Sequence, residues 1–293
     1  MGLPNVGKST LFNALVEGSQ AQAANFPFCT IEPNMGTVPV PDQRLERLSE
    51  LSKSKSTVST TIEFVDIAGL VSGASKGEGL GNKFLSHIRE VDAIVHVVRC
   101  FEDDDVVHVD GSVDPIRDSE VIETELALSD MAQIERRFER MKKGSKGKKG
   151  NDKALEEMEK KALEEIYSKV EQGVPARKAD LEEDDFELVK GLGLLTMKPV
   201  IFAANVAEDD LMDEAASNKH AQALRKKAEE ENGRFVLVSA RMEEELVELS
   251  GDERQEFLDG FGIKQTGLQT LIKVAYDMLG LRTYFTTGEK ETR

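Results

Sequence analysis

The sequence predicts an α/β protein with a mostly parallel β-sheet, helices on both faces, and an inserted antiparallel helical hairpin or coiled coil. Three observations carry this expectation. Short apolar or β-branched runs alternate with helical patterns, a long middle stretch shows helical spacing without a convincing strand, and the 293 residues are ample for a buried core.

Composition and charge narrow the class of protein. The 55 acidic and 38 basic side chains give a net charge of -17, with 32% charged and 39% hydrophobic residues. These values are typical of a soluble globular chain. The longest apolar runs, 93–98 and 199–204, are too short to cross a bilayer. The acidic surplus opposes nucleic-acid binding by the chain as a whole, although a local basic segment can still dock on phosphate.

Four segments have the composition of buried strands. They are rich in Val, Ile and Phe, are separated by helical patterns, and cover residues 61–66, 93–99, 199–205 and 235–239. Such alternation favours a parallel sheet wrapped by helices.

The middle of the chain, from 118 to about 197, follows a different pattern. Apolar residues recur there at intervals of three and four, which places them on one face of each of two helices. In the first helix they are Met131, Ile134, Phe138 and Met141, and in the second Leu155, Met158, Ala162, Ile166 and Val170. Between the helices, residues 142–150 hold five lysines and three glycines and nothing to bury. We therefore expect a helical hairpin with a basic tip.

The strongest chemical signal is residues 2–10, which satisfy G-x-x-x-x-G-K-[ST]. Glycines let successive backbone N–H groups point inward, and the helix that follows directs its positive end at a phosphate. Lys8 supplies a charge for the β and γ oxygens, and the Ser9 hydroxyl is a ligand for Mg²⁺. A chance glycine-rich turn is the weaker explanation, because further elements follow in the right order.

A second motif, D-x-x-G, ends the run 62–69. Asp66, at the end of a predicted strand, is placed to hold Mg²⁺ through water, and the Gly69 N–H to sense the γ-phosphate. Thr30, between the two motifs, is either a second hydroxyl ligand of the metal or an ordinary loop threonine. The residue after Gly69 is Leu70, which cannot orient the attacking water. We therefore expect either slow intrinsic hydrolysis or a water-positioning group that comes from elsewhere.

Recognition of the base is expected at the ends of two later strands. The run 199–204 ends in Asn205-Val206-Ala207-Glu208, where guanine-specific switches have N-K-x-D. Glu208 displaces the carboxylate by one methylene and Val206 lacks the long stem that covers the base, which weakens guanine selection. The backbone at Ser239 and Ala240, after the last strand, is placed to touch the base.

These motifs, together with the ordered segments 25–33, 63–89, 96–101, 195–199 and 283–288, resemble the YchF or Obg-like ATPases, a branch of the translation-factor P-loop NTPases with a G-domain-like fold. The resemblance runs over essentially the whole chain. It implies ATP in preference to GTP, Ser9 and Thr30 on Mg²⁺, the Val206 backbone near adenine, and ribosome association in the cytosol. It places these residues on the phosphates: Asn5, Val6, Gly7, Lys8, Ser9 and Thr10.

The same resemblance suggests a division of the chain. We expect a nucleotide-binding domain in two parts, 1–117 and 198–282, an insertion at 118–197, and the start of a TGS domain at 283–293. Relatives have a hydrophobic strand before the phosphate loop, and only Met1 precedes Gly2 here. We therefore expect a truncated start that leaves unpaired backbone on two neighbouring strands and does not exclude an organellar location.

Two other functions compete with an ATP-hydrolysing switch. One is a GTPase of the Obg-related class. The other is a non-enzymatic ribosome or RNA adaptor that works through the hairpin tip, where the basic loop is either a solvated connection or a contact for rRNA phosphate. The tip lysines are Lys142, Lys143, Lys146, Lys148 and Lys149.

Overall fold

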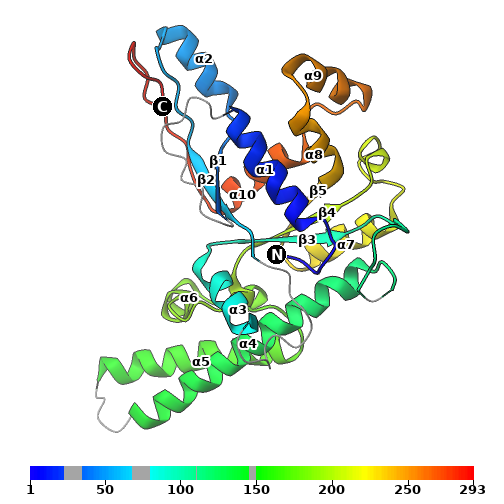
Figure 1. The fold of residues 1–293 in the computed structure, drawn as a ribbon. Coiled ribbons are helices and arrows are strands. Elements are labelled where there is room, and N and C mark those ends of the chain that lie inside the picture. The colour runs from blue at the N-terminus through cyan, green and yellow to red at the C-terminus, as the bar shows by residue number, and fades with distance from the viewer. Residues whose placement is uncertain (23–34, 68–79, 110, 145–149) are drawn as a thin grey trace.

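A parallel three-stranded sheet lies at the centre of the computed structural model, which describes residues 1–22, 35–67, 80–109, 111–144 and 150–293 (Figure 1). Its order is β3-β4-β5, with β3 at Ile94–Arg99, β4 at Val200–Asn205 and β5 at Arg234–Val238. Every residue of the middle strand β4 is buried, as expected for a strand covered on both faces. The α/β class predicted from the sequence is confirmed.

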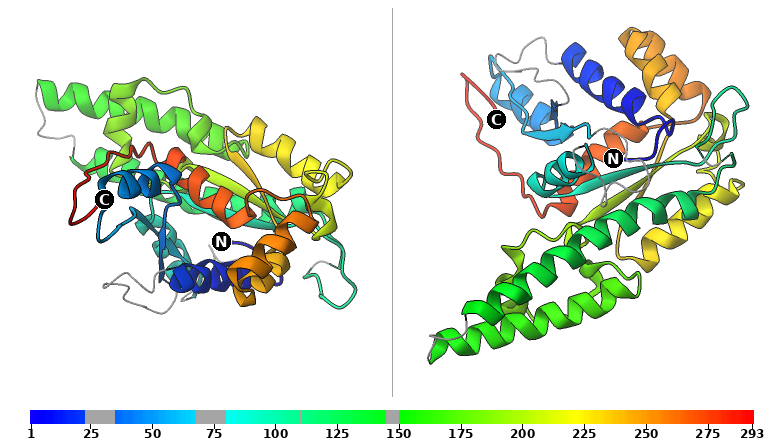
Figure 2. Two further views of the ribbon diagram at one scale, coloured as in Figure 1. Left: turned by 90° about the horizontal axis from the view of Figure 1, so that it is seen from above. Right: turned by 60° about the horizontal axis from the view of Figure 1, so that its bottom comes forward.

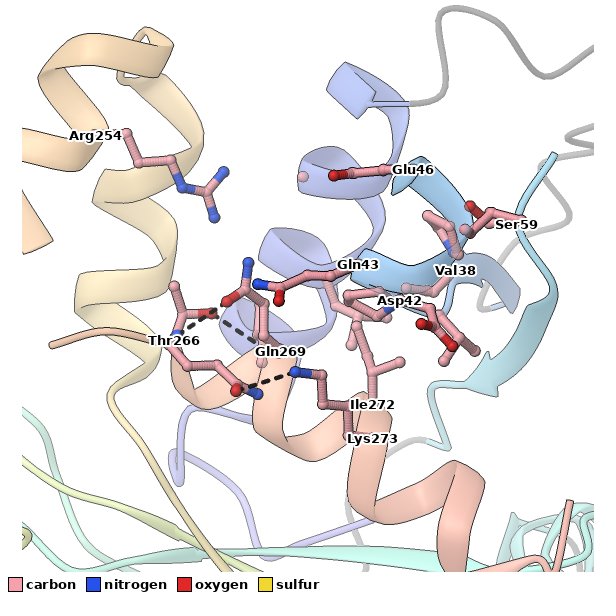
Figure 3. Close-up of a pocket in the computed structure, with 18 of the residues that line it drawn as sticks. Val38, Asp42, Gln43, Glu46, Ser59, Arg254, Thr266, Gln269, Ile272 and Lys273 are labelled. Carbon is pink, nitrogen blue, oxygen red and sulfur yellow. Dashed lines mark hydrogen bonds between the residues drawn. The ribbon is translucent and has the colours of Figure 1, made fainter. Parts of the chain in front are cut away.

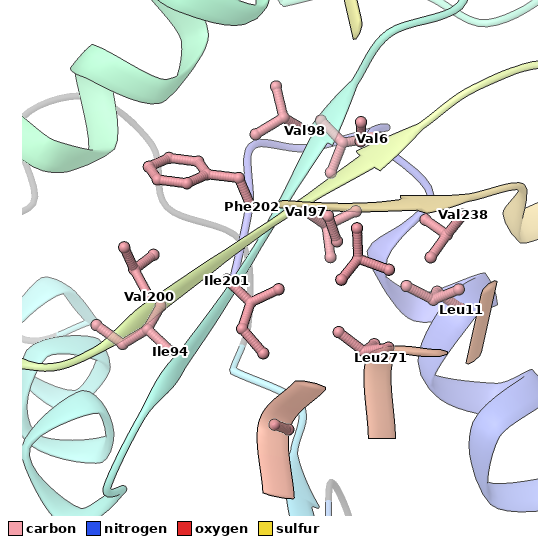
Figure 4. Close-up of a cluster of buried hydrophobic side chains, with 14 of the residues drawn as sticks. Val6, Leu11, Ile94, Val97, Val98, Val200, Ile201, Phe202, Val238 and Leu271 are labelled. Carbon is pink, nitrogen blue, oxygen red and sulfur yellow. The ribbon is translucent and has the colours of Figure 1, made fainter. Parts of the chain in front are cut away.

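Helices cover both faces of this sheet. Two views agree that α1 (Lys8–Gln22), α8 (Ala240–Glu248) and α10 (Gly267–Met278) lie on one side, and α4 (Pro115–Gly144) and α7 (Lys219–Glu230) on the other (Figures 1 and 2). Neighbouring β4 residues therefore point into different halves of the core. Figure 4 shows Ile201 on the side of Leu271 and Phe202 on the opposite side. Both side chains are fully buried.

The prediction that 61–66 is a buried strand of the parallel sheet is wrong. β2 (Thr61–Val65) pairs antiparallel with β1 (Met35–Pro39) in a separate two-stranded sheet. Thr61 and Glu63 are exposed, so one face of β2 meets solvent, which antiparallel pairs tolerate. β1 escaped prediction because a five-residue strand with an internal glycine and a terminal proline has no apolar run.

The chain start lies beside β3. The Met1 amino group donates to the Val95 carbonyl at 2.7 Å, and the Val97 N–H donates to the Met1 carbonyl at 2.8 Å. Between β2 and β3 a small, mostly apolar cavity of about 50 Å³ is lined by Phe64, Val95 and neighbouring residues.

Two long helices form the hairpin expected from the middle of the sequence. α4 and α5 (Asn151–Glu171) lie side by side, and Arg137 on α4 bonds Glu159 on α5 through two hydrogen bonds of 2.6 Å (Figure 1). Their shared core includes Ile134, Leu163 and Ile166, all fully buried. The described part of 118–197 contains no strand.

The expectation that Leu155 and Met158 face this core is wrong. Their exposed fractions are 48% and 40%, whereas Ala162, Ile166 and Val170 are buried as expected. The Arg137–Glu159 bonds place the first turns of α5 opposite the last turns of α4, where Met141 is buried in the hairpin core and Phe138 packs against it. Leu155 and Met158 remain exposed there, and burial along α5 begins at Glu159.

α4 crosses the predicted start of the insertion at 118. Ile122 and Leu126 belong to the core under the parallel sheet, and Ile134 and Met141 to the hairpin core. The division into domains therefore remains a prediction, with α4 shared by both units.

The remaining elements connect these parts. They are the helices α2 (Gln43–Ser52), α3 (Leu80–Glu90), α6 (Glu183–Lys190) and α9 (Gly251–Gly260), and the short 3₁₀ turns η2 (Ala176–Lys178), η3 (Leu195–Met197) and η4 (Asp209–Leu211). Across the described ranges, no helix combines the length and apolarity that a bilayer crossing requires.

A buried histidine makes the stability of this core sensitive to acid. His96 on β3 is 1% exposed, and its Nδ1 has no hydrogen-bond partner. Burial, reinforced by nearby positive charges including Lys227, lowers the His96 pKa to about 3. The unfolded chain binds this proton below its ordinary pKa of about 6.5 and the folded chain does not, so stability falls as pH drops from that value toward 3.

Replacing His96 by Phe should remove this sensitivity. Each pH unit below the unfolded pKa costs the wild-type chain about 1.4 kcal/mol, so roughly 2 kcal/mol of His96-dependent destabilisation is expected at pH 5. Urea unfolding at pH 7.5 and pH 5 measures it. The difference in unfolding free energy between the two pH values should shrink by that amount in His96→Phe and stay unchanged in the control His220→Phe, whose ring is partly exposed. An identical pH dependence in wild type and His96→Phe would show that the buried ring is protonated in the folded state.

Candidate functional site

The motif at residues 2–10 forms a tight loop that runs directly into a helix. Asn5 has a φ of 60° and Gly7 a φ of 86°, both in the left-handed region. α1 begins immediately afterwards at Lys8, and the Leu11 N–H donates to the Gly7 carbonyl at 2.9 Å. Thr10 lies half-buried in this first turn. Backbone N–H groups at such a helix start form a site for an anion.

Asn205 ties this loop to the rest of the site. Its side chain is 3% exposed, its Nδ2 donates to the Val6 carbonyl at 2.9 Å, and its Oδ1 accepts from the Ala240 N–H at 2.9 Å. One side chain at the end of β4 therefore fixes the phosphate loop and the start of α8 in relation to each other. Gly7 packs against this amide, where a Cβ would come within 2.3 Å of Asn205 Nδ2.

Three of the predicted site residues meet where α1 begins. Lys8 Nζ forms a short ion pair with Asp66 Oδ1 and lies 3.4 Å from Ser9 Oγ. Asp66 directly follows β2, so the start of α1 and the end of β2 bring an ammonium, a hydroxyl and a carboxylate together. The Lys8 and Asp66 side chains are 12% and 15% exposed, which leaves both of them reachable.

The predicted base-recognition residues lie after β4 and β5. Val206 is 2% exposed and its N–H donates to the Val238 carbonyl at 2.9 Å. Ser239 caps α8, its hydroxyl accepting from the Met242 N–H, and Ala240 is buried. The ends of two adjacent parallel strands thus meet the phosphate loop at one edge of the sheet.

Glu208 sits at this edge without a hydrogen bond to its Oε1, which is buried. Arg241 Nε lies 3.5 Å from that oxygen and also 3.4 Å from Glu245 Oε1. Burial and the neighbouring Glu245 raise the Glu208 pKa, against the opposing charge of Arg241.

Thr30 and Gly69 lie outside the described residues, as does Leu70 and most of the glycine-rich run that follows it. Their predicted roles remain predictions.

The structure also brings to the site a loop that sequence reasoning missed. Residues 101–109 follow β3, and the Val107 carbonyl accepts from Asn5 Nδ2 at 3.1 Å. Arg99, the last residue of β3, is 2% exposed beneath this loop. The available signal was Arg99 itself, a charged residue at the end of a strand whose other residues, apart from His96, are apolar.

A wide cleft lies elsewhere in the described chain. It measures about 900 Å³ and opens between α1 and α2 on one side and α8, α9 and α10 on the other (Figure 3). Gln43 and Glu46 line it from α2, Arg254 from α9, and Gln269 and Lys273 from α10. None of the predicted phosphate, metal or base residues that the structure describes lines it, so volume alone does not mark the site.

Comparison with known proteins agrees with this geometry. The profile of a family described as 50S ribosome-binding GTPase matches residues 1–125. The ribosome-binding ATPase YchF of Bacillus subtilis is 52% identical over 293 residues, which covers 100% of this chain and 78% of that relative. The ribosome-binding ATPase YchF of Escherichia coli O157:H7 is 48% identical with the same coverage.

A solved structure shares the fold. The YchF GTPase of Schizosaccharomyces pombe superimposes with a TM-score of 0.87 and 39% identity, covering 100% of this chain and 78% of that one. Identity at this level over the full length, with the phosphate loop at its start, leaves no other assignment. The chain belongs to the YchF family of P-loop nucleotide-binding proteins.

Proposed function

We propose that the chain is a Mg²⁺-dependent ATPase that acts with ribosomes as a nucleotide-controlled switch. The observation that supports it best is that Lys8, Ser9 and Asp66 meet at the start of α1. The loop before them has a left-handed backbone at Gly7. An ammonium beside a helix start suits a triphosphate. The relatives' names, ribosome-binding ATPase, point to the same activity.

The donor set fits Mg²⁺. A hydroxyl and a carboxylate are hard oxygen ligands, and Mg²⁺ takes one or two such protein ligands together with water and phosphate oxygens. We propose Ser9 and Thr30 as direct ligands and Asp66 as a ligand through water. Held by these residues, Mg²⁺ would neutralise charge on the phosphates, and Lys8 would add its own charge at the γ-phosphate. In this scheme Lys8 leaves its ion pair with Asp66 and binds a phosphate oxygen instead. The Asp66 carboxylate is then available to bind the metal through water.

The choice of base is the finer part of the proposal. Related proteins are named both ATPase and GTPase. Two features of this chain support adenine. The Val206 side chain is buried and offers no stem to cover a base, and Glu208 lies beside Arg241, whose donors compete with guanine for its carboxylate. A carboxylate facing the unprotonated N1 of adenine is repelled, so a displaced Glu208 removes the penalty against ATP.

Shortening Glu208 to Asp tests this choice. Under the ATP proposal Glu208→Asp should tighten GTP binding at least about tenfold, because a correctly placed carboxylate gains hydrogen bonds worth about 1.5 to 3 kcal/mol each. Adding Val206→Lys should increase the gain in GTP affinity further. This second change places a lysine ammonium at a position where the Val206 side chain is buried. Calorimetric titration with GTP and ATP in Mg²⁺ measures both. A chain already selective for GTP, and unmoved by Glu208→Asp, would favour the GTPase alternative. Glu245→Asp is the matched control, since it shortens the other carboxylate that contacts Arg241.

We further propose that the hairpin tip contacts rRNA. Lys142 and Lys143 are exposed at the end of α4, and Lys146, Lys148 and Lys149 lie outside the described residues. The end of α4 and the start of α5 are the parts of the described hairpin farthest from the central sheet (Figure 2). A cluster of lysines on a projecting helix pair suits phosphate binding even in an acidic protein.

Replacing these five lysines by Ala should lower ribosome association and leave basal ATP hydrolysis intact. The log–log slope of binding against salt should weaken by about one unit for each rRNA phosphate that the variant no longer neutralises. Co-sedimentation with ribosomes over a salt series is the measurement. Ala at five exposed lysines elsewhere, Lys55, Lys219, Lys226, Lys264 and Lys290, is the charge-matched control. Equal losses of ribosome association in the two variants would mean that only net charge matters, and would contradict a contact at the hairpin tip.

The same assay addresses the non-enzymatic adaptor. That alternative expects ribosome association to survive Lys8→Ala unchanged at every ATP concentration. The switch expects ATP to change association in the wild-type chain and to have no effect in Lys8→Ala.

A further inference from the structure

A buried arginine determines the shape of the loop that follows β3. Arg99 directs its three guanidinium nitrogens at three carbonyls of that loop: Nε to Phe101 at 3.1 Å, Nη1 to Val106 at 2.9 Å and Nη2 to Asp103 at 3.1 Å. Its guanidinium carbon also lies 4.7 Å from the centroid of the Phe101 ring. The segment 101–106 is thus wrapped around one cation.

This arrangement is unusual for a buried charge. Arg99 is 2% exposed, and the hydrogen bonds that the structure gives its guanidinium all go to backbone carbonyls. A buried guanidinium is costly unless its donors are satisfied, and here backbone carbonyls satisfy them. The planar fork fixes the directions of all three bonds, so the loop has little freedom while Arg99 stays in place.

The loop shaped by Arg99 touches the phosphate loop. The residue after Val106 is Val107, and its carbonyl accepts from Asn5 Nδ2 at 3.1 Å. Asn5 lies within the phosphate-binding motif and holds a left-handed backbone. On the far side of Val107 the loop is anchored again, because His108 Nε2 lies 2.9 Å from Asp118 Oδ2 on α4. The Val107 carbonyl is therefore held between two anchors and presented to Asn5.

We propose that Arg99 is a positioning residue for nucleotide hydrolysis, acting through the Val107 carbonyl on the Asn5 side chain of the phosphate loop. This inference rests on the proposed ATPase function. Asn5 then keeps one orientation beside the triphosphate, and the loop 101–109 moves only when the phosphate loop moves. Most of the loop is exposed, so its carbonyls gain water when the guanidinium is removed, and the expected effect is local.

Arg99→Met tests the proposal, since methionine keeps an apolar stem and removes all three donors. We expect kcat for ATP to fall about tenfold to a hundredfold, the range a misplaced group costs, with KM changed less than about threefold. Asn5→Ala, at an exposed position, should lower kcat similarly, and the double variant should be no worse than the more severe single one. Arg99→Lys should recover part of the activity.

Arg137→Met is the matched control, because it removes an arginine from the hairpin, where its partner is Glu159. Its kcat should equal that of the wild-type chain. Two results would overturn the proposal. One is a kcat in the Arg99→Met, Asn5→Ala double variant that falls by the product of the two single effects, and the other is an unchanged kcat in Arg99→Met.

Amide exchange gives a readout that does not need activity. In Arg99→Met, exchange should accelerate in residues 2–10 as well as in 101–109, and a loop that loosens alone would contradict the link through Asn5. A wild-type chain that hydrolyses no ATP would remove the proposed function, whereas the exchange result tests the connection between the two loops by itself.

Discussion

Gly7→Ala should abolish measurable ATP binding, an expected loss of at least about a hundredfold in affinity. The φ of 86° disfavours any L side chain, and an ideal Cβ at this position would lie 2.3 Å from Asn205 Nδ2 and 3.3 Å from the Ala240 Cβ. Relief requires Asn205 to give up its bond to the Val6 carbonyl or the loop to change its backbone. Either movement redirects the N–H groups that face the phosphates.

The same substitution should also destabilise the fold by about 2 to 4 kcal/mol, since it combines left-handed strain with a broken buried hydrogen bond. Calorimetric titration with ATP and Mg²⁺, together with urea unfolding, measures the two effects. Gly18→Ala, on the helix α1 that follows the loop, is the matched control. Its Cβ would have only an ordinary contact, 3.9 Å from Val247, and Ala favours a helix over Gly by about 1 kcal/mol. Unchanged ATP affinity in Gly7→Ala would mean that the nucleotide does not use this loop.

Asp130→Ala should cause the largest loss of stability, about 3 to 5 kcal/mol. The Asp130 carboxylate on α4 is fully buried and accepts three hydrogen bonds, from the Leu195 N–H at 2.8 Å and from the Thr196 N–H and hydroxyl at 2.7 Å each. Burial raises the Asp130 pKa, against these donors. Removing the carboxylate takes away the buried acceptor that the Leu195 N–H, the Thr196 N–H and the Thr196 hydroxyl share.

The effect should extend beyond the site of the change. η3 leads into Lys198, whose ammonium donates to the Arg89 carbonyl at 3.1 Å and to the Val91 carbonyl, at the end of α3. Releasing η3 therefore loosens the attachment of α3 as well as that of the hairpin. Chemical unfolding is the measurement, with exposed Asp184→Ala as the control. A change within about 0.5 kcal/mol, the usual range for surface substitutions, would contradict this role for Asp130.

Local patterns predicted much of this structure. The three strands of the parallel sheet follow apolar runs, and β4 is buried along its whole length, so the run of residues 199–205 was sufficient to identify it. The phosphate loop was predictable because its geometry depends on residues adjacent in sequence, above all Gly7 and Lys8. The hairpin helices follow a spacing of three and four over many turns.

Long-range contacts were beyond such patterns. The antiparallel pairing of β1 with β2 depends on a partner that carries no apolar run, and the exposure of Leu155 depends on what lies opposite it on another helix. The bond of Asp130 to the Leu195 N–H joins two groups that are far apart in the chain and whose sequence context is ordinary. These contacts depend on the tertiary structure, and no single segment of the sequence determines them.

The meeting of Lys8, Ser9 and Asp66 illustrates both cases. Each residue was identifiable from its motif, but that the end of β2 meets the start of α1 is a property of the fold. Thr30 and Gly69, outside the described residues, stay predictions from the motifs alone.

Isothermal titration of the chain with ATP in Mg²⁺, beside its Lys8→Ala variant, tests the central claim most directly. We expect saturable heat with ATP at concentrations up to the millimolar range, weaker heat with GTP, and a loss of at least about tenfold in ATP affinity when the ammonium is removed. No heat from either nucleotide, or equal affinities in the two chains, would contradict it.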